Sequence, residues 1–491
     1  MGLAVLDYVI VGVYLVGVTV AGIRTGGQQK SSVDYFLGGK EMAWWAVGFS
    51  IVASETSTLT FISIPGLAYK SNLQFIQLAF GYFIGRLLVS CVFIPAYYKG
   101  DLETAYDFLG KRFGMPLRKF TSSVFIVTRV LASGVRLFAT AIPVHFITGL
   151  NYTSCILLIG VFALIYTYVG GLKAVVAMDV VQMCISLGGA IASMVVILHH
   201  LDNGWGDVVH FATLGGDNKF KMLNLHTGST FWAFLKTPYT LAGGLLGGTF
   251  LSMASHGTDQ LLVQRLLGCK TRWDSQRALI LDATFIVIQF AFFLGLGLCL
   301  FAFYGGVPYQ ELGLKSSDEI FPKFIVENLP TGVAGLVIAG LLASAMGTLS
   351  SSISSLASAT FLDLFKLSPK VIFLRQDREL KWSRAFTLFW GIILIVGAML
   401  FRDVRSPVVE LGLKITSFTY GGLLGTFLLG LFSPRSNQRD ACTGFLSGIA
   451  CMTGVLLLTE VDFTWHTLIG CLATTGVGSI SALRNRKGLT S

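Results

Sequence analysis

The sequence predicts an all-α polytopic membrane protein with about 13 transmembrane helices, and three observations support this prediction. Of the 491 residues, 53% are hydrophobic and only 13% are charged, and the mean hydropathy is +0.71. A soluble domain could not keep so much apolar surface away from water. Apolar stretches of about 20 residues, the length that crosses a bilayer, also recur along the whole chain.

The apolar stretches are bounded by charged residues or by Gly and Pro, which places each span in the chain. About three times as many Lys and Arg residues flank them on one side as on the other. This bias predicts an N-terminus outside and a C-terminus in the cytoplasm, in a plasma (inner) membrane. The predicted spans are 4–23, 43–69, 74–98, 119–148, 152–170, 174–200, 237–265, 277–304, 331–365, 383–402, 409–433, 441–459 and 463–483.

Composition also narrows the class of partner. The net charge is +10, but the basic residues are scattered through short loops, so they fit membrane topology better than nucleic-acid binding. The eight cysteines form no CxxC pair and lie almost entirely in apolar spans, so no disulfide or metal framework is expected. An enzyme is not expected, because the sequence shows no nucleophile next to a base at membrane depth. The expected partners are the lipid bilayer and a small solute, without an obligate protein partner.

The stretch 43–69 carries the most informative polar residues. At its middle, Glu55 is followed by three hydroxyl residues, with Thr60 just beyond. An acid in hydrocarbon is costly and usually has a ligand or partner. Ser and Thr side chains compete with the helix for backbone hydrogen bonds and favour local unwinding. We therefore predict that Ala53 to Thr60 is the unwound hinge of a transport site, with bare carbonyls available to a cation.

A second predicted span is also interrupted. The glycine-rich stretch 237–265 is broken by the polar residues of 255–259. Two interrupted helices at corresponding positions of two halves are typical of an inverted-repeat transporter with a binding site at the midplane. The order of spans predicts one five-helix repeat at 43–200 and a second at 237–433. The remaining segments are a leading helix with an inner loop at 1–42, an outer loop at 201–236, and two peripheral helices with an inner tail at 434–491.

Two other spans carry polar stripes. On 174–200, Asp179, Gln182 and Ser186 share one helical face. Gln182 and Ser186 suit hydrogen bonding between helices, whereas an ionised Asp179 needs a cation nearby. On 331–365, hydroxyl residues that include Thr348 and Ser351 recur along one face. Such neutral oxygens suit an alkali cation, although packing of small residues is the alternative for this helix.

The charges at membrane depth leave several roles open. Arg136 lies mid-span, where it could bind a carboxylate by paired hydrogen bonds or neutralise Glu55 or Asp179. Arg86 and Arg129 lie nearer the ends of their spans and are interpreted as structural.

Three further polar groups have alternative interpretations. His256 and Asp259 could serve a substrate or a gate, or could simply stabilise a helix end. Lys414 lies one turn from Glu410 and could pair with it or extend toward the membrane surface. Asp363, at the inner end of its helix, is interpreted as structural.

Five motifs of this chain, in the expected order between about residues 4 and 435, resemble the sodium:solute symporter family. They are WWAVGFSIVASETSTLTF, GGLKAVVAMDVVQ, TDQLLVQRLLG, ASAMGTLSSSISS with FLDLF, and SFTYGGLLGTFLLG. That family includes sodium-coupled proline, sugar, iodide, monocarboxylate, vitamin and sialic-acid carriers. The resemblance implies the leucine-transporter fold with one extra leading helix, and alternating access driven by Na+.

The resemblance also implies two sets of sodium ligands. In the first site, carbonyls at the first break face small and hydroxyl residues of the ninth span, and Gly347 stands where many members have serine. That ligand would then be absent or supplied by backbone or water. The matching positions of the first site are Ala53, Thr56, Ser344, Gly347 and Thr348. The positions that match a possible second sodium site are Asp179, Ser350 and Ser351.

The resemblance implies a substrate site at the first break. Ser57 and Thr60, with Arg136, resemble the groups that hold the substrate carboxylate in sialic-acid carriers. Glu55 stands at a position that is acidic in proline carriers and neutral in sugar carriers, and His256 is a further candidate.

We therefore expect a symporter that imports Na+ with a small organic solute, and a carboxylate of the monocarboxylate or sialic-acid type is favoured. The alternatives are a sugar or an inorganic anion as solute, or proton coupling through Glu55 and Asp179. A channel or a sensor would need a continuous polar pore or an appended signalling domain, and the sequence indicates neither.

Overall fold

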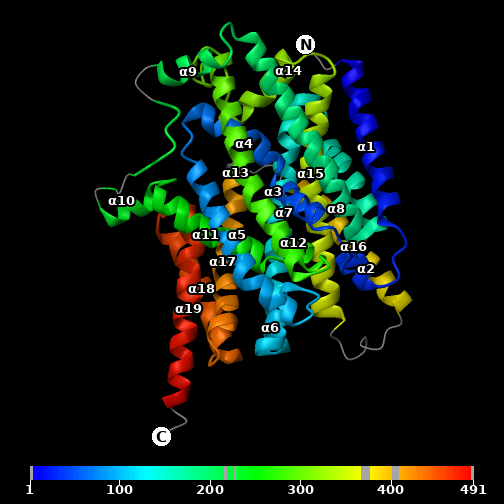
Figure 1. Ribbon diagram of the computed structural model, residues 1–491, viewed down its shortest axis with the longest axis vertical. Coiled ribbons are helices and arrows are strands. Elements are labelled where there is room, and N and C mark those ends of the chain that lie inside the picture. The colour runs from blue at the N-terminus through cyan, green and yellow to red at the C-terminus, as the bar shows by residue number, and fades with distance from the viewer. Residues whose placement is uncertain are drawn as a thin grey trace.

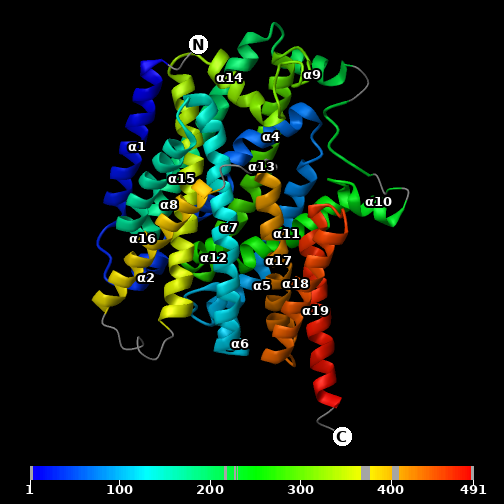
Figure 2. The ribbon, with the colours of Figure 1, turned by 180° about the vertical axis from the view of Figure 1, so that it is seen from behind.

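The computed structural model describes residues 4–214, 218–225, 228, 230–366, 376–400 and 408–487. These residues form helices joined by short connections, and no strand is present among them beyond a single bridge between Met42 and Cys269. The all-α prediction is confirmed, and Figures 1 and 2 show long, roughly parallel helices with the N- and C-termini at opposite ends of the bundle.

Each of the thirteen predicted spans corresponds to a helix or to a broken pair of helix segments. The longest helices are α1 (Val5–Gly26), α5 (Ile76–Lys99), α7 (Met115–Thr148), α8 (Tyr152–His200), α13 (Arg272–Phe303), α15 (Val333–Ala359), α16 (Gln376–Leu400), α17 (Val408–Phe432), α18 (Gln438–Leu458) and α19 (Phe463–Lys487). The broken spans are α3 (Trp44–Glu55) with α4 (Thr58–Lys70), and η3 (Gly243–Gly247) and α11 (Gly248–Thr258) with α12 (Gln260–Leu267). Short helices in the connections are α2 (Ser32–Leu37), α6 (Ala105–Phe113), α9 (Trp205–Thr213), α10 (Phe231–Lys236) and α14 (Ile320–Asn328).

By length and hydropathy alone, nine helices of the described chain are able to cross a membrane, and the α3 and α4 pair makes a tenth. The difference from thirteen has a structural cause. α8 contains two predicted spans that meet at Gly171, whose φ of 60° breaks the helix. The span of α11 and α12 is divided into short segments, and α17 is described only in part.

The first predicted break is present. α3 ends at Glu55, Thr56 has a ψ of 73° and Ser57 is extended, so the helix restarts at Thr58. The two segments are bent by 59°. Thr58 Oγ1 donates a hydrogen bond of 3.1 Å to the carbonyl of Leu341, which fixes the start of α4 against α15. The unwound residues therefore face the helix that carries the hydroxyl stripe.

The second break is sharper than the sequence indicated. The helix α11 continues through Thr258, and only Asp259 leaves helical geometry, with φ −84° and ψ 121°. Its carboxylate accepts a hydrogen bond of 2.9 Å from the amide of Leu261 and caps α12. A capping acid thus replaces the longer unwound stretch predicted for 255–259.

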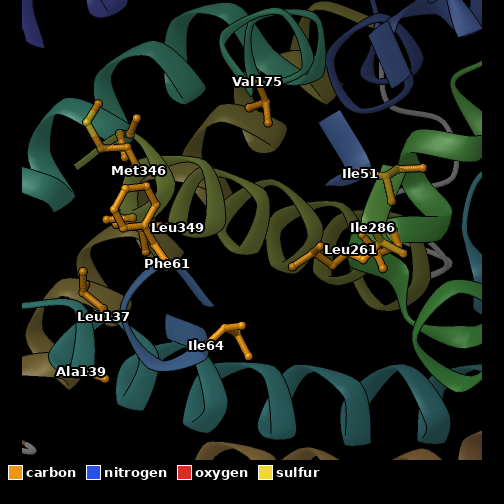
Figure 3. Packing of buried hydrophobic residues seen from close by; sticks show 14 of the residues in the cluster. Ile51, Phe61, Ile64, Leu137, Ala139, Val175, Leu261, Ile286, Met346 and Leu349 are labelled. Atoms are coloured by element: carbon orange, nitrogen blue, oxygen red, sulfur yellow. The ribbon is translucent and has the colours of Figure 1, made fainter. Parts of the chain in front are cut away.

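A single large cluster of buried apolar side chains holds the broken helices in place. Figure 3 shows members of this cluster from seven segments, α3, α4, α7, α8, α12, α13 and α15. Phe61 of α4 packs on Phe293 and Phe321, with ring centroids 5.3 and 5.5 Å apart. The helix after the first break is therefore anchored on aromatic rings, and the break itself is left to polar contacts.

Close helix packing gives a test of the fold. A Cβ added at Gly85 of α5 would lie 2.5 Å from the carbonyl of Thr249 in α11, so we expect Gly85→Ala to destabilise the protein by about 1–3 kcal/mol. Gly12 of α1 has no atom within 4 Å of its added Cβ, so Gly12→Ala is the matched control. Thermal melting of the purified protein in detergent measures both. Equal melting temperatures for the two variants would contradict the packing of α5 on α11.

Candidate functional site

Two cavities meet at the first break, and they differ in size and chemistry. The smaller has a volume of about 10 Å³, room for one water-sized body. The larger has a volume of about 470 Å³, within the range of small-molecule sites. Both are lined by residues of the α3 and α4 connection, so a change at this break affects both.

The small cavity gathers four of the five residues predicted for the first sodium site. Ala53 and Thr56 line it from the end of α3, and Ser344 and Gly347 line it from α15. Thr348 is not in its wall: its hydroxyl donates to the carbonyl of Ser344 at 3.0 Å and more weakly to that of Ser54 at 3.4 Å. Thr348 therefore links α15 to the broken helix beside the cavity.

The small cavity also has a wall from α8 that was predicted only as helix packing. Ser186 fits that prediction, since it donates to the carbonyl of Gly340 at 2.8 Å. Gln182 is 1% exposed, and its amide oxygen has no hydrogen-bond partner among the described residues. A Cβ at Gly347 would lie 3.0 Å from Gln182 Oε1. The glycine therefore leaves the space in which the amide oxygen reaches the cavity.

These groups fit a sodium ion. The cavity has room for one small ion, and its polar lining consists of hydroxyl, carbonyl and amide oxygens, the hard neutral ligands that suit an alkali cation. Gln182 Oε1 is a buried acceptor without a donor, which a cation would satisfy.

Asp179, predicted for a second sodium site, is already paired with an arginine. Its Oδ2 accepts hydrogen bonds from Ser50 at 2.5 Å and from Arg265 at 3.0 Å. Arg265 also donates to Ser351, another predicted ligand. Only Asp179 Oδ1 remains without a hydrogen-bond partner among the described residues. The alternative that Arg136 neutralises Asp179 is thus wrong. Arg265 lay within the TDQLLVQRLLG motif, but its role was not predicted.

The large cavity brings together all five residues predicted for the substrate. They come from the first break, from α7 and from α11, and are Glu55, Ser57, Thr60, Arg136 and His256. Arg136 forms no ion pair and no hydrogen bond with any other described residue. The hydroxyls of Ser57 and Thr60 likewise have no partner in that part of the chain. Three hydrogen-bond donors of the wall are therefore free for a ligand.

The other two arginines of the cavity are not free. Arg86 pairs with Glu55 and also faces Asp282. Arg129 pairs with Asp259, whose carboxylate also accepts a hydrogen bond of 2.6 Å from Tyr420. Arg86 and Arg129 were interpreted as structural only, and both line the cavity. The predicted contact between Lys414 and Glu410 lies outside the side chains that the structure describes.

Polar groups of the connections, Lys70 and Asp318, line one end of the large cavity, which we call its mouth. Lys70 ends α4 there, and Asp318 precedes α14, near the N-terminal end of the bundle (Figure 1). Burial raises the pKa of the Asp318 carboxyl above its ordinary value, although a hydrogen bond of 3.1 Å from Ser63 opposes the shift. The mouth therefore lies toward the end of the bundle where the chain begins.

The sequence profile of the sodium:solute symporter family matches residues 35–448. The chain belongs to the sodium:solute symporter family. It is therefore a sodium-coupled symporter with a leucine-transporter-like fold, which works by alternating access and uses Na+ as coupling ion.

Two relatives and one solved structure show how far the likeness to this family extends. The sodium/sialic acid symporter NanT of Aliivibrio fischeri is 28% identical, over 99% of this chain and 94% of its own. The sodium-coupled monocarboxylate transporter 1 of Xenopus laevis is 30% identical, over 90% of this chain and 70% of its own. A solved Na+-coupled sialic acid symporter in a substrate-bound outward-open state has a TM-score of 0.87 and 27% identity, covering 98% of each chain.

Removing Arg265 tests the buried pair of this symporter. Arg265→Gln leaves the Asp179 carboxylate buried without a cation, so we expect a loss of about 3–5 kcal/mol of stability. Lys323→Gln removes a more exposed partner of Glu327 and should cost about 0–1 kcal/mol. Thermal melting compares the two. The double variant Arg265→Gln with Asp179→Asn should recover part of the loss, and no recovery would show that Arg265 acts by packing.

Proposed function

We propose that this symporter imports an organic acid of the sialic-acid class together with Na+. The observation that carries the proposal is the free Arg136 guanidinium in a cavity whose other arginines are paired. A guanidinium and two hydroxyls suit a carboxylate, which accepts paired hydrogen bonds. The volume of about 470 Å³ favours a solute of sugar-acid size over an acid of three or four carbons. The relatives named as sialic acid symporters agree with this assignment.

For the sodium ion, we assign the small cavity. Carbonyls of Ala53 and Thr56 and the Ser344 hydroxyl would supply oxygens from two helices, and Gln182 Oε1 would take the place of the serine that Gly347 lacks. The hydroxyl of Thr348 would complete the set after a small rotation. A second ion would have to use Asp179 Oδ1 with Ser350, since Arg265 holds the rest of that site.

Coupling follows from the shared break. Sodium would bridge the end of α3 to α15, and the solute would bind to Ser57 and Thr60 on the next residues. Each ligand then favours the same arrangement of the break, so each raises the affinity for the other by the same factor.

The remaining expectations belong to this proposal. The two repeats are assigned to 43–200 and 237–433, and the flanking segments to 1–42, 201–236 and 434–491. The N-terminus is assigned to the outside of the plasma (inner) membrane, which makes the mouth of the large cavity its external entrance. Neither a catalytic activity nor an obligate protein partner is proposed.

Substitutions at Thr348 test the sodium site. Thr348→Ala removes one oxygen ligand, so we expect sodium binding to weaken by about 1–2 kcal/mol. This loss corresponds to a roughly tenfold rise in the sodium concentration for half-maximal uptake. Thr348→Ser keeps the hydroxyl and should stay close to the parent chain. Ser355→Ala, on the same helix, removes a hydroxyl that donates to the carbonyl of Ser352 and is the matched control. Uptake of labelled solute into liposomes measures all three, and an unchanged sodium dependence in Thr348→Ala would count against the site.

Ligand chemistry tests the substrate site. In sodium, N-acetylneuraminate should raise the melting temperature, whereas its methyl ester, glucose and proline should not, because only the acid presents a carboxylate to Arg136. Arg136→Gln should weaken binding of the acid by about ten- to a hundredfold, the loss expected for a charged hydrogen-bonded pair. Arg136→Lys should retain part of the affinity. Equal binding of acid and ester would exclude the carboxylate as the recognised group, and a shift with pyruvate alone would reassign the solute to a monocarboxylate.

A further inference from the structure

Four ionisable side chains from four helices meet under the large cavity. Glu55 of α3, Arg86 of α5 and His256 of α11 line the cavity, and Asp282 of α13 lies behind them. His256 Nε2 is 3.1 Å from Glu55 Oε1 and 3.4 Å from Asp282 Oδ2. Arg86 Nε donates a hydrogen bond of 3.1 Å to His256 Nε2 and lies 3.0 Å from Asp282 Oδ2. Arg86 also pairs with Glu55 through its terminal nitrogen. We call these four residues the α11 cluster.

The charges of the α11 cluster do not balance without a proton. Two carboxylates face one guanidinium, which stays charged in proteins. Asp282 and His256 are 0% exposed and Arg86 is 1% exposed, whereas the Glu55 side chain is 22% exposed to the cavity, so water reaches only the Glu55 end of the cluster. Neither oxygen of Asp282 accepts a well-formed hydrogen bond from any described donor. The cluster therefore lacks one positive charge and one hydrogen-bond donor.

A proton meets this need better than a metal ion. Oxygen and nitrogen atoms of Glu55, His256 and Asp282 all lie within 4.8 Å of one another, as they would around a metal. The Arg86 guanidinium, however, already lies between them and would repel a second cation at that distance. A proton on an Asp282 oxygen needs no extra space. A proton on His256 Nε2 would donate to Glu55 or Asp282 once the Arg86 Nε–H has turned from Nε2 to Asp282 Oδ2, which is 3.0 Å away.

The other side of the imidazole ring can serve both charge states. His256 Nδ1 is 3.2 Å from the carbonyl of Ser252 and 2.9 Å from the hydroxyl of Ser255. When Nδ1 carries a hydrogen, it donates to that carbonyl. When Nδ1 is bare, the Ser255 hydroxyl can turn and donate to it instead of to Ser252, which lies at 3.2 Å from its oxygen. His256 Nδ1 therefore finds a hydrogen-bond partner whether or not it carries a hydrogen.

The other charged groups near the cluster form no ion pair with His256 or Asp282. Arg136 of α7 lies on the same cavity wall within electrostatic range of Glu55, and it is the group assigned to the solute carboxylate. Tyr82 of α5 also faces Glu55 and Arg86, but a tyrosine is neutral unless it loses a proton. Arg129 of α7 and Asp259, the next charges along the cavity wall, neutralise each other beside Tyr420 of α17. In the described parts of the neighbouring α6, α12 and α19, no charged side chain forms an ion pair with His256 or Asp282.

We propose that His256 and Asp282 form a proton-binding site beneath the substrate cavity, and that the symporter takes up a proton when it binds an anionic solute. The proposal rests on the proposed function only for the charge of that solute. An anion placed above Glu55 adds negative charge to a buried site, and a proton in the α11 cluster offsets it. By linkage, proton binding raises the affinity for the anion as much as the anion raises the affinity for the proton.

Calorimetry counts the protons. The full-length protein in saturating sodium is titrated with N-acetylneuraminate in buffers of different ionisation enthalpy, over about pH 5 to 9. We expect uptake that approaches one proton per solute at the upper end of this range and vanishes at the lower end, where the site is already filled. His256→Gln and Asp282→Asn should abolish it, and His210→Gln, at an exposed histidine of α9, should leave it unchanged. Binding without proton uptake in the parent chain at every pH would overturn the proposal.

A second measurement needs no solute and so separates this proposal from the choice of substrate. Nitrogen-15 NMR of labelled histidine identifies the His256 ring by the signal missing in His256→Gln. We expect this ring to be charged at neutral pH and to lose its proton at lower pH in Asp282→Asn. A ring that stays neutral down to about pH 5 would overturn the proposal even if the solute assignment is correct. Sodium-dependent thermal stabilisation of each variant establishes that it is folded.

Discussion

The need to pair every charge at membrane depth governs this structure. A charged side chain removed from water loses several kcal/mol of hydration unless a partner restores it. Three ion pairs connect a broken helix to another helix. They are Arg86 with Glu55, Arg265 with Asp179, and Arg129 with Asp259. Each break therefore has a buried acid, Glu55 or Asp259, that an arginine of another helix neutralises. These ion pairs fix the broken helices against their neighbours.

This constraint makes the exceptions informative. Arg136 forms no ion pair with any described residue, and neither oxygen of Asp282 in the α11 cluster accepts a hydrogen bond there. Both lie on the wall of one cavity or directly behind it. The unpaired Arg136 on the wall can bind an anionic solute, and the carboxylate of the α11 cluster can bind a proton. A carrier that binds both ligands needs these two groups. The same side chains would be hard to explain as packing, since apolar residues would be more stable there.

The sequence was sufficient for the parts of the fold that depend on local pattern. Apolar length predicted every span, and Ser and Thr after Glu55 predicted the first break, because both signals act through neighbouring residues. The candidate substrate residues also line one cavity as expected. For Glu55, Ser57 and Thr60 the reason is local, since the break places these neighbouring residues together. Pairing could not be predicted in the same way: Arg265 reaches Asp179 from 86 residues away, and no local pattern joins them. Asp282 was a detectable signal, an acid inside an apolar span, that the sequence reasoning passed over.

Another buried ion-pair network lies beyond the C-terminal end of α15. Arg118 of α7 pairs with Asp363, in the turn η5 (Thr360–Phe365) that follows α15, at 2.8 Å and with Asp107 of α6 at 2.5 Å. The hydroxyl of Thr104 donates to Asp363 at 2.6 Å. These groups are buried, so separating them exposes charge that only entering water can solvate. The sodium site proposed between α3 and α15 uses Ser344 and Gly347, in the middle of the same helix. Under that proposal, α15 connects the sodium site to the buried ion pairs at this end of the bundle, so a movement of α15 would change both.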